Sequence, residues 1–181
     1  MKTSKTRTGT SRLSHRTLAL FALAISLALP SGNALAVGEL TCVASSEISY
    51  SPGLRLFTQQ TDITFDTGYS GCTSLTGSPI ISGSRSGSFS GPRSCLALPP
   101  SGSALVEVTW SNGQISVVDA TSQSTDAAGQ TIHLITGPII SGPFTGRTFN
   151  EQIVQASLDL LYCLTAPGVT FQSGTGVMEI L

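Results

Sequence analysis

Short apolar or alternating segments recur between clusters of turn-forming residues along the chain, and this spacing is typical of β-strands joined by tight turns. Strong helix formers are scarce after residue 36, and apolar residues do not recur there at the 3.6-residue period of a helix. The pattern predicts an all-β fold, a single antiparallel two-sheet sandwich of roughly nine strands. The expected strands are 40–44, 54–58, 62–66, 79–83, 104–111, 114–120, 131–140, 158–164 and 176–181.

The Asn-Gly dipeptide at 112–113 predicts the best-defined hairpin, because both central residues of a type I′ turn adopt positive φ and Asn-Gly tolerates it. A two-residue loop would pair Trp110 with Ile115 and Val108 with Val117. These four apolar side chains would then share one face of the hairpin. We therefore expect Trp110 to lie in the core.

Residues 1–36 have the layout of a cleaved signal peptide, with basic residues, an apolar stretch at 18–29 and the small-x-small site Ala-Leu-Ala at 34–36. We expect a secreted protein whose single β-sandwich domain spans residues 37–181. That part has ten acidic residues, four arginines and no lysine, a formal net charge of −6. Such a surface disfavours nucleic acid, and no later stretch reaches the roughly 20 apolar residues that a membrane span needs.

Four cysteines lie in the part expected to be exported: Cys42, Cys72, Cys95 and Cys163. An even number in an oxidising compartment favours two structural disulfides over a metal site, since the chain has no Cys-x-x-Cys pair. Three pairings are possible. We favour Cys42 with Cys72 and Cys95 with Cys163, because sequential pairing needs the fewest crossings in an all-β chain. No metal or cofactor is expected.

His133 is the only histidine after residue 36, so a serine or cysteine nucleophile would need it. We expect it to be a surface histidine on a strand. Asp62 and Asp66 would share a strand face, but their Cα atoms would lie about 13 Å apart, beyond the ~5 to 9.5 Å between glycosidase carboxyls. The glycine-serine alternation at 84–90 is interpreted as a low-complexity loop or an edge strand. No catalytic residue is assigned.

The leader, the Ser/Thr/Gly-rich composition, the Trp-Ser-Asn-Gly hairpin at 110–113 and the Gly-Thr-Gly strand at 174–176 together resemble small secreted actinobacterial proteins of uncharacterised function. The resemblance implies a secreted β-sandwich with two disulfides and no activity. The order Cys95, Trp110, Cys163 is also similar to the Cys-Trp-Cys pattern of immunoglobulin domains. Leu161 stands where that pattern has a tyrosine.

We expect a non-enzymatic extracellular protein with a binding or surface-association role, whose partner is an unknown protein or glycan. The alternative is a secreted hydrolase on the same scaffold. Its active site would need His133, or two acidic side chains that meet in a cleft.

Overall fold

The computed structural model describes residues 38–97 and 99–181, so the predicted signal peptide lies outside the described residues. These ranges form eight antiparallel strands and one short helix. The elements in chain order are β1 Leu40–Leu54, β2 Gln59–Thr73, β3 Gly83–Arg93, β4 Gly102–Trp110, β5 Ile115–Ala127, β6 Gln130–Ser141, β7 Thr148–Ala156, α1 Leu160–Leu164 and β8 Val169–Ile180.

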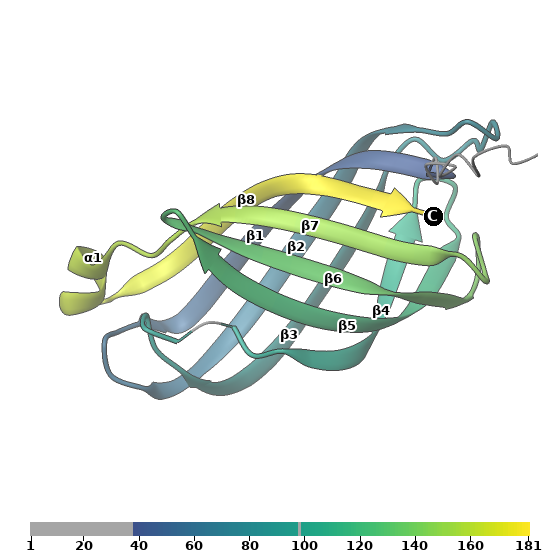
Figure 1. Cartoon of the computed structure of the whole chain (residues 1–181). Helices are drawn as coiled ribbons and strands as arrows, with labels where there is room; N and C mark the ends of the chain where they lie inside the picture. The colour runs from purple at the N-terminus through teal and green to yellow at the C-terminus, as the bar shows by residue number, and fades with distance from the viewer. Residues whose placement is uncertain (1–37, 98) are drawn as a thin grey trace, which may run out of the picture. The chain divides into compact units, whose positions relative to one another are not determined.

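Each strand pairs with the next one in the chain, and β8 pairs back with β1, so the sheet closes into a barrel (Figure 1). The all-β prediction is confirmed, but the two-sheet sandwich is wrong, and the immunoglobulin-like topology with it. The strands are longer than expected, and β1 and β2 have 15 residues each. Long twisted strands at a steep tilt allow one continuous sheet to curl until its first and last strands meet.

The β4–β5 hairpin forms at the predicted place but one residue out of the predicted register. Thr109, not Trp110, pairs with Ile115, and of the Asn-Gly pair only Gly113 has a positive φ, 80°. The loop therefore has three residues with a glycine in the left-handed region, instead of a type I′ turn. A one-residue slip turns every side chain of a strand to its other face. Ile115 is accordingly exposed, whereas Val118 lies inside with Trp110.

Other strand predictions were also incomplete. The segment 158–164 contains the helix α1 instead of a strand, and Asp159 caps its first turn by accepting a hydrogen bond from the Leu161 N–H. The expected strands at 54–58 and 79–83 are mostly loops. Of the two alternatives for 84–90, a loop or an edge strand, the segment is a strand, part of β3, and β7 was not predicted at all.

One end of the barrel is filled by a packed apolar core. Tyr69, Trp110 and Phe149 form its centre, and Trp110 is only 2% exposed, as predicted. The Trp110 Nε1–H donates to Ser116 Oγ over 2.8 Å, which satisfies the one polar group of the indole. Phe144, from the connection between β6 and β7, packs edge-on against Trp110 with ring centroids 5.8 Å apart. This core closes the barrel at the end that carries the C-terminus (Figure 1).

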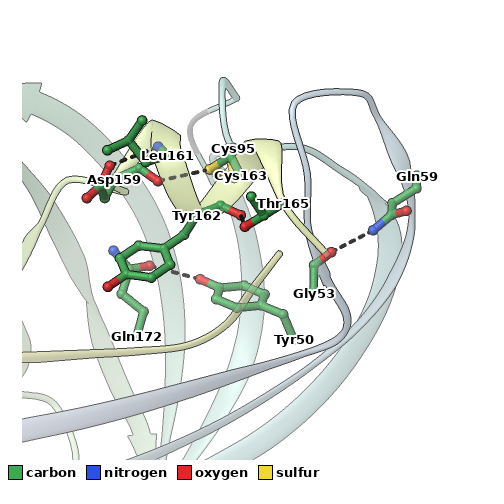
Figure 2. The surroundings of a disulfide bond; sticks show 10 residues. All are labelled: Tyr50, Gly53, Gln59, Cys95, Asp159, Leu161, Tyr162, Cys163, Thr165 and Gln172. Atoms are coloured by element: carbon green, nitrogen blue, oxygen red, sulfur yellow. Dashed lines mark hydrogen bonds between the residues drawn. A yellow bond between two sulfur atoms is a disulfide. The ribbon is translucent and has the colours of Figure 1, made fainter. Parts of the chain in front are cut away.

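Two disulfides join Cys42 to Cys72 and Cys95 to Cys163, which confirms the favoured pairing. The first links β1 to the end of β2 beside the packed core. The second ties the β3–β4 connection to α1, at the end of the barrel opposite the C-terminus (Figures 1 and 2). No helix in residues 38–97 and 99–181 is long and apolar enough to cross a membrane.

Candidate functional site

The barrel interior beyond the packed core contains a cavity of about 990 Å³. Eight-stranded barrels have an interior that is either filled by side chains or wide enough for one small ligand, and this barrel combines the two. Every strand contributes to the cavity wall. The lining is largely apolar and includes Ile48, Tyr50, Leu54, Ile63, Phe65, Phe89, Val106, Ala120, Ile135, Ile153 and Leu158.

A buried ion pair lies between the packed core and the cavity. Arg85 Nε donates to Glu151 Oε2 over 3.1 Å and to the Tyr69 hydroxyl over 3.0 Å, and Arg85 Nη2 donates to Glu151 Oε1. The Tyr69 hydroxyl in turn donates to Glu151 Oε2. Glu151 is fully buried, and such a charge is tolerated inside a protein only when it is paired and hydrogen-bonded. We call Tyr69, Arg85 and Glu151 the polar layer.

Arg85 and Tyr69, the donors of the polar layer, keep their protons. Burial by itself would lower the pKa of Arg85, but the hydrogen bonds and the charge of Glu151 outweigh burial and raise that pKa above its usual value. Burial, together with the charge of Glu151, raises the pKa of Tyr69 well above its usual value. Arg85 is therefore charged, Tyr69 is protonated, and the pair with Glu151 has no net charge.

Phe65 and Gly87 hold the Arg85 side chain in place. The Arg85 guanidinium lies 5.1 Å from the centroid of the Phe65 ring, within the range of a cation–π contact. A Cβ atom on Gly87 would come within 2.7 Å of Phe65 Cζ, so any larger residue there would displace this ring. The glycine thus makes room for the aromatic face on which the cation rests.

His133 faces the cavity, so its prediction as a surface histidine was wrong. Its Nε2 lies 2.9 Å from Gln155 Oε1, and its Nδ1 lies 2.9 Å from Ser124 Oγ. Because an amide oxygen only accepts, the proton is on Nε2, and Nδ1 accepts from the Ser124 hydroxyl. Burial lowers the pKa of His133 below its usual 6.5, with the hydrogen bond to Gln155 opposing that shift in part. The imidazole is therefore neutral at pH 7.

This arrangement lacks the orienting carboxylate of a serine hydrolase. The amide of Gln155, in place of an acid, takes the His133 N–H, and Ser124 is not one of the residues that line the cavity. Asp62 and Asp66 are exposed on the outer face of β2, as the strand alternation predicted. In the described ranges, no three His, Cys, Asp or Glu side chains come together as metal ligands would.

Gln155 carries a polar atom that the protein leaves unused. The residue is 2% exposed, and its Nε2 has no hydrogen-bond partner in the described part of the chain. An unsatisfied buried donor costs about 1 to 3 kcal/mol. Gln155 belongs to the cavity wall, but this nitrogen has almost no exposed surface, so a ligand in the cavity could supply the missing partner only after a small movement of the side chain.

The cavity opens between β3 and β4. Gly83 pairs with Trp110 and Ser84 with Thr109, and the described residues form no further pair between these strands. Beyond this point, consecutive residues of both strands line the cavity, at 86–89 and 103–107. Since neighbouring residues of a strand point to opposite faces, a run of lining residues indicates that the cavity passes between the two strand edges. This gap provides an entry path from the side.

The rim of the cavity is tied together by a disulfide and by hydrogen bonds. Figure 2 shows Tyr50 beside Gln172, with the Tyr50 hydroxyl donating to Gln172 Oε1 over 3.0 Å. Burial raises the pKa of Tyr50 to about 12, although the charge of Arg93 acts in the opposite direction. The Cys95–Cys163 bridge lies close by and connects the β3–β4 segment to α1. The hydrogen bond therefore joins β1 to β8 at this rim, and the disulfide joins the β3–β4 connection to α1.

Arg85, Glu151 and Gln155 were not among the residues that the sequence pointed to. A signal was present in β3, where serines at 84, 86, 88 and 90 alternate with Gly, Arg, Gly and Phe at 83–89. Strict alternation is typical of a strand with two different faces. It was missed because the inward face of β3 is mostly glycine and arginine instead of apolar residues.

Comparisons with protein-family models, with curated proteins and with solved structures found no match for this chain. The two disulfides are consistent with an extracellular or other oxidising location. We therefore infer a function from the cavity and its polar groups.

Proposed function

We propose that this protein is an extracellular binding protein that holds one mainly apolar small molecule inside its barrel. The observation that carries the proposal is the cavity of about 990 Å³, largely apolar, with a few polar groups in its wall. Ligand pockets are typically about 300 to 1,000 Å³, with apolar walls and few polar groups. The proposal keeps the expected binding role but places the partner inside the barrel instead of on its outer surface.

Export is part of this proposal. It is supported by the signal-peptide layout of residues 1–36 and by two disulfides, which persist in oxidising compartments. In a carrier of a poorly soluble compound, the closed barrel would shield the compound from water, and the Cys95–Cys163 bridge would hold the rim of the cavity together.

Binding is favoured over catalysis because the reactive groups near the cavity are engaged with one another. Arg85 is paired with Glu151, and the proton on His133 is held by Gln155. The hydroxyl that contacts His133, on Ser124, is not in the cavity wall. A ligand in the cavity would therefore meet side chains that bind and orient it.

The proposal can be tested with N-phenyl-1-naphthylamine, a neutral fluorophore that brightens in an apolar site. Titration should give a saturable signal with one site per barrel. Ser122→Trp should abolish it, because Ser122 faces the cavity and a large indole there would occupy the space. Gln123→Trp is the matched control: it adds the same indole on the exposed face of β5 and should bind like the wild type.

Failure of the wild type to bind, or equal binding by both tryptophan variants, would contradict an internal ligand site. The hydrolase alternative has a separate readout. Steady turnover of 1-naphthyl acetate that disappears in His133→Gln would favour the enzyme and would remove the basis for a passive carrier.

A further inference from the structure

We infer that the ligand carries a neutral hydrogen-bond acceptor, such as a carbonyl oxygen, which binds a donor that Gln155 or Arg85 leaves unused in the cavity wall. This inference rests on the proposed binding function and specifies the chemistry that the cavity selects. It follows from a count of the hydrogen-bonding groups that the protein leaves unused there.

The amide of Gln155 is held in one orientation by a short chain of hydrogen bonds. The Ser124 hydroxyl donates to His133 Nδ1, and His133 Nε2 donates to Gln155 Oε1. This chain uses the amide oxygen and leaves the amide nitrogen, Nε2, without a partner. The unused group is therefore a donor, and it calls for an acceptor on the ligand.

Arg85 contributes a second unused donor. Its Nε and Nη2 are bonded to Tyr69 and Glu151, whereas Nη1 donates to none of the residues that the structure describes. Nη1 is also not one of the fully buried, unpartnered atoms, and Arg85 lines the cavity. A guanidinium has five N–H donors, so the pair with Glu151 leaves some of them for a ligand oxygen.

The charges around these donors favour a neutral acceptor over an anion. Glu151 already compensates the charge of Arg85 at close range, so an anionic ligand would bring a second negative charge beside a buried carboxylate. The anion would also lose its hydration shell, and the polar layer has no uncompensated cation to offset that cost, since Arg93, the other arginine of the cavity wall, lies near Tyr50 at the rim. A carbonyl oxygen can accept a hydrogen bond from either donor without this cost.

Three naphthalenes of similar shape separate these possibilities: 2-ethylnaphthalene, 2-acetylnaphthalene and 2-naphthoate. Each can be measured by its displacement of N-phenyl-1-naphthylamine. We expect the acetyl compound to bind about 3- to 10-fold more tightly than the ethyl compound, the gain for one or two net hydrogen bonds. The naphthoate should bind more weakly than both.

Gln155→Leu should reduce the preference for the acetyl compound over the ethyl compound by about threefold. Gln152→Leu is the matched control, because Gln152 is exposed on the other face of β7. It should keep the full preference. The fluorescence of Trp110, which lies in the packed core, reports whether each variant has folded.

The outcomes distinguish this inference from the proposed function. If the fluorophore does not bind, the proposed function fails. If the fluorophore binds but the ethyl and acetyl compounds bind equally, or the naphthoate binds best, the carrier role stands and the inference is overturned. The wild-type ranking decides this even if Gln155→Leu does not fold.

Discussion

The two ends of this barrel are built from the same eight strands, yet one end is solid and the other is hollow. At the packed end, inward positions carry large side chains such as Tyr69, Trp110 and Phe149. At the hollow end, β3 turns Gly87 and Gly91 inward, and β5 turns Ser122 inward. The backbone also differs, because β3 and β4 pair only beside the packed core and separate along the cavity. Small side chains at inward positions and the gap between these two strands therefore both contribute to the cavity.

The polar layer marks the boundary between these two ends. Arg85 and Glu151 line the cavity, while their partner Tyr69 belongs to the apolar core. Buried ion pairs contribute little net stability compared with apolar residues of similar size, but breaking one is costly. This layer is therefore expected to serve the hollow end as a polar floor, with the packed end supplying most of the stability.

The largest expected effect comes from breaking the layer on one side. Arg85→Leu should lower the free energy of unfolding by about 3 to 5 kcal/mol, because Glu151 stays buried without its partner. Arg85→Leu combined with Glu151→Leu should recover most of that loss, since no charge then remains buried. Urea denaturation of the wild type and both variants measures this. A double variant as unstable as the single one would mean that the layer itself holds the barrel together.

The packing of the two ends can be compared by making the same isoleucine-to-alanine change at two positions of β6. Ile139 is 1% exposed in the packed core, whereas Ile135, four residues earlier on β6, is part of the cavity wall. Ile139→Ala should cost about 2 to 5 kcal/mol, because it opens a new void among packed atoms. Ile135→Ala should cost clearly less, because it enlarges a space that already exists. Equal losses in urea denaturation would show that the two ends are packed alike.

The smallest expected effect concerns pH. Burial lowers the pKa of His133 below 6.5 in the folded protein, so the unfolded chain takes up this proton more readily. The contribution of neutral His133 to stability is complete above about pH 6.5 and is lost as the pH falls through and below that value.

Urea denaturation at about pH 8 and about pH 5 should therefore show a smaller pH-dependent loss in His133→Gln than in the wild type. The other titrating groups are common to both proteins, so the difference isolates this side chain. Identical pH dependence would mean that His133 titrates as an exposed histidine does.

Much of the fold was open to prediction from the sequence, but the site was not. The packed end follows ordinary rules, and the burial of Trp110 was predicted even though the register of its hairpin was not. That register depended on whether Asn112 would adopt positive φ, and it does not. The backbone conformation of this one loop residue therefore places Ile115 on the surface instead of in the expected core.

The hollow end breaks the rule by which strands are recognised. Strand prediction looks for apolar side chains on one face, but β3 and β7 carry glycine, arginine, glutamate and glutamine among their inward residues. For this reason β3 was interpreted as a loop or an edge strand, and β7, whose inward residues include Glu151 and Gln155, was missed. His133 was placed on the surface by the same reasoning.

The amino-acid sequence was enough to predict the all-β class and to favour the correct pairing of the four cysteines among three possibilities, because both rest on local pattern and on chain order. The closure of the sheet could not be predicted in this way, since it needs β1 to pair with β8 across more than a hundred residues, beginning with Leu40 opposite Ile180. Because the sheet closes, Arg85 of β3, His133 of β6, and Glu151 and Gln155 of β7 line the same cavity. These side chains interact with one another because the barrel shields them from water. A local sequence pattern does not show which residues will share that interior.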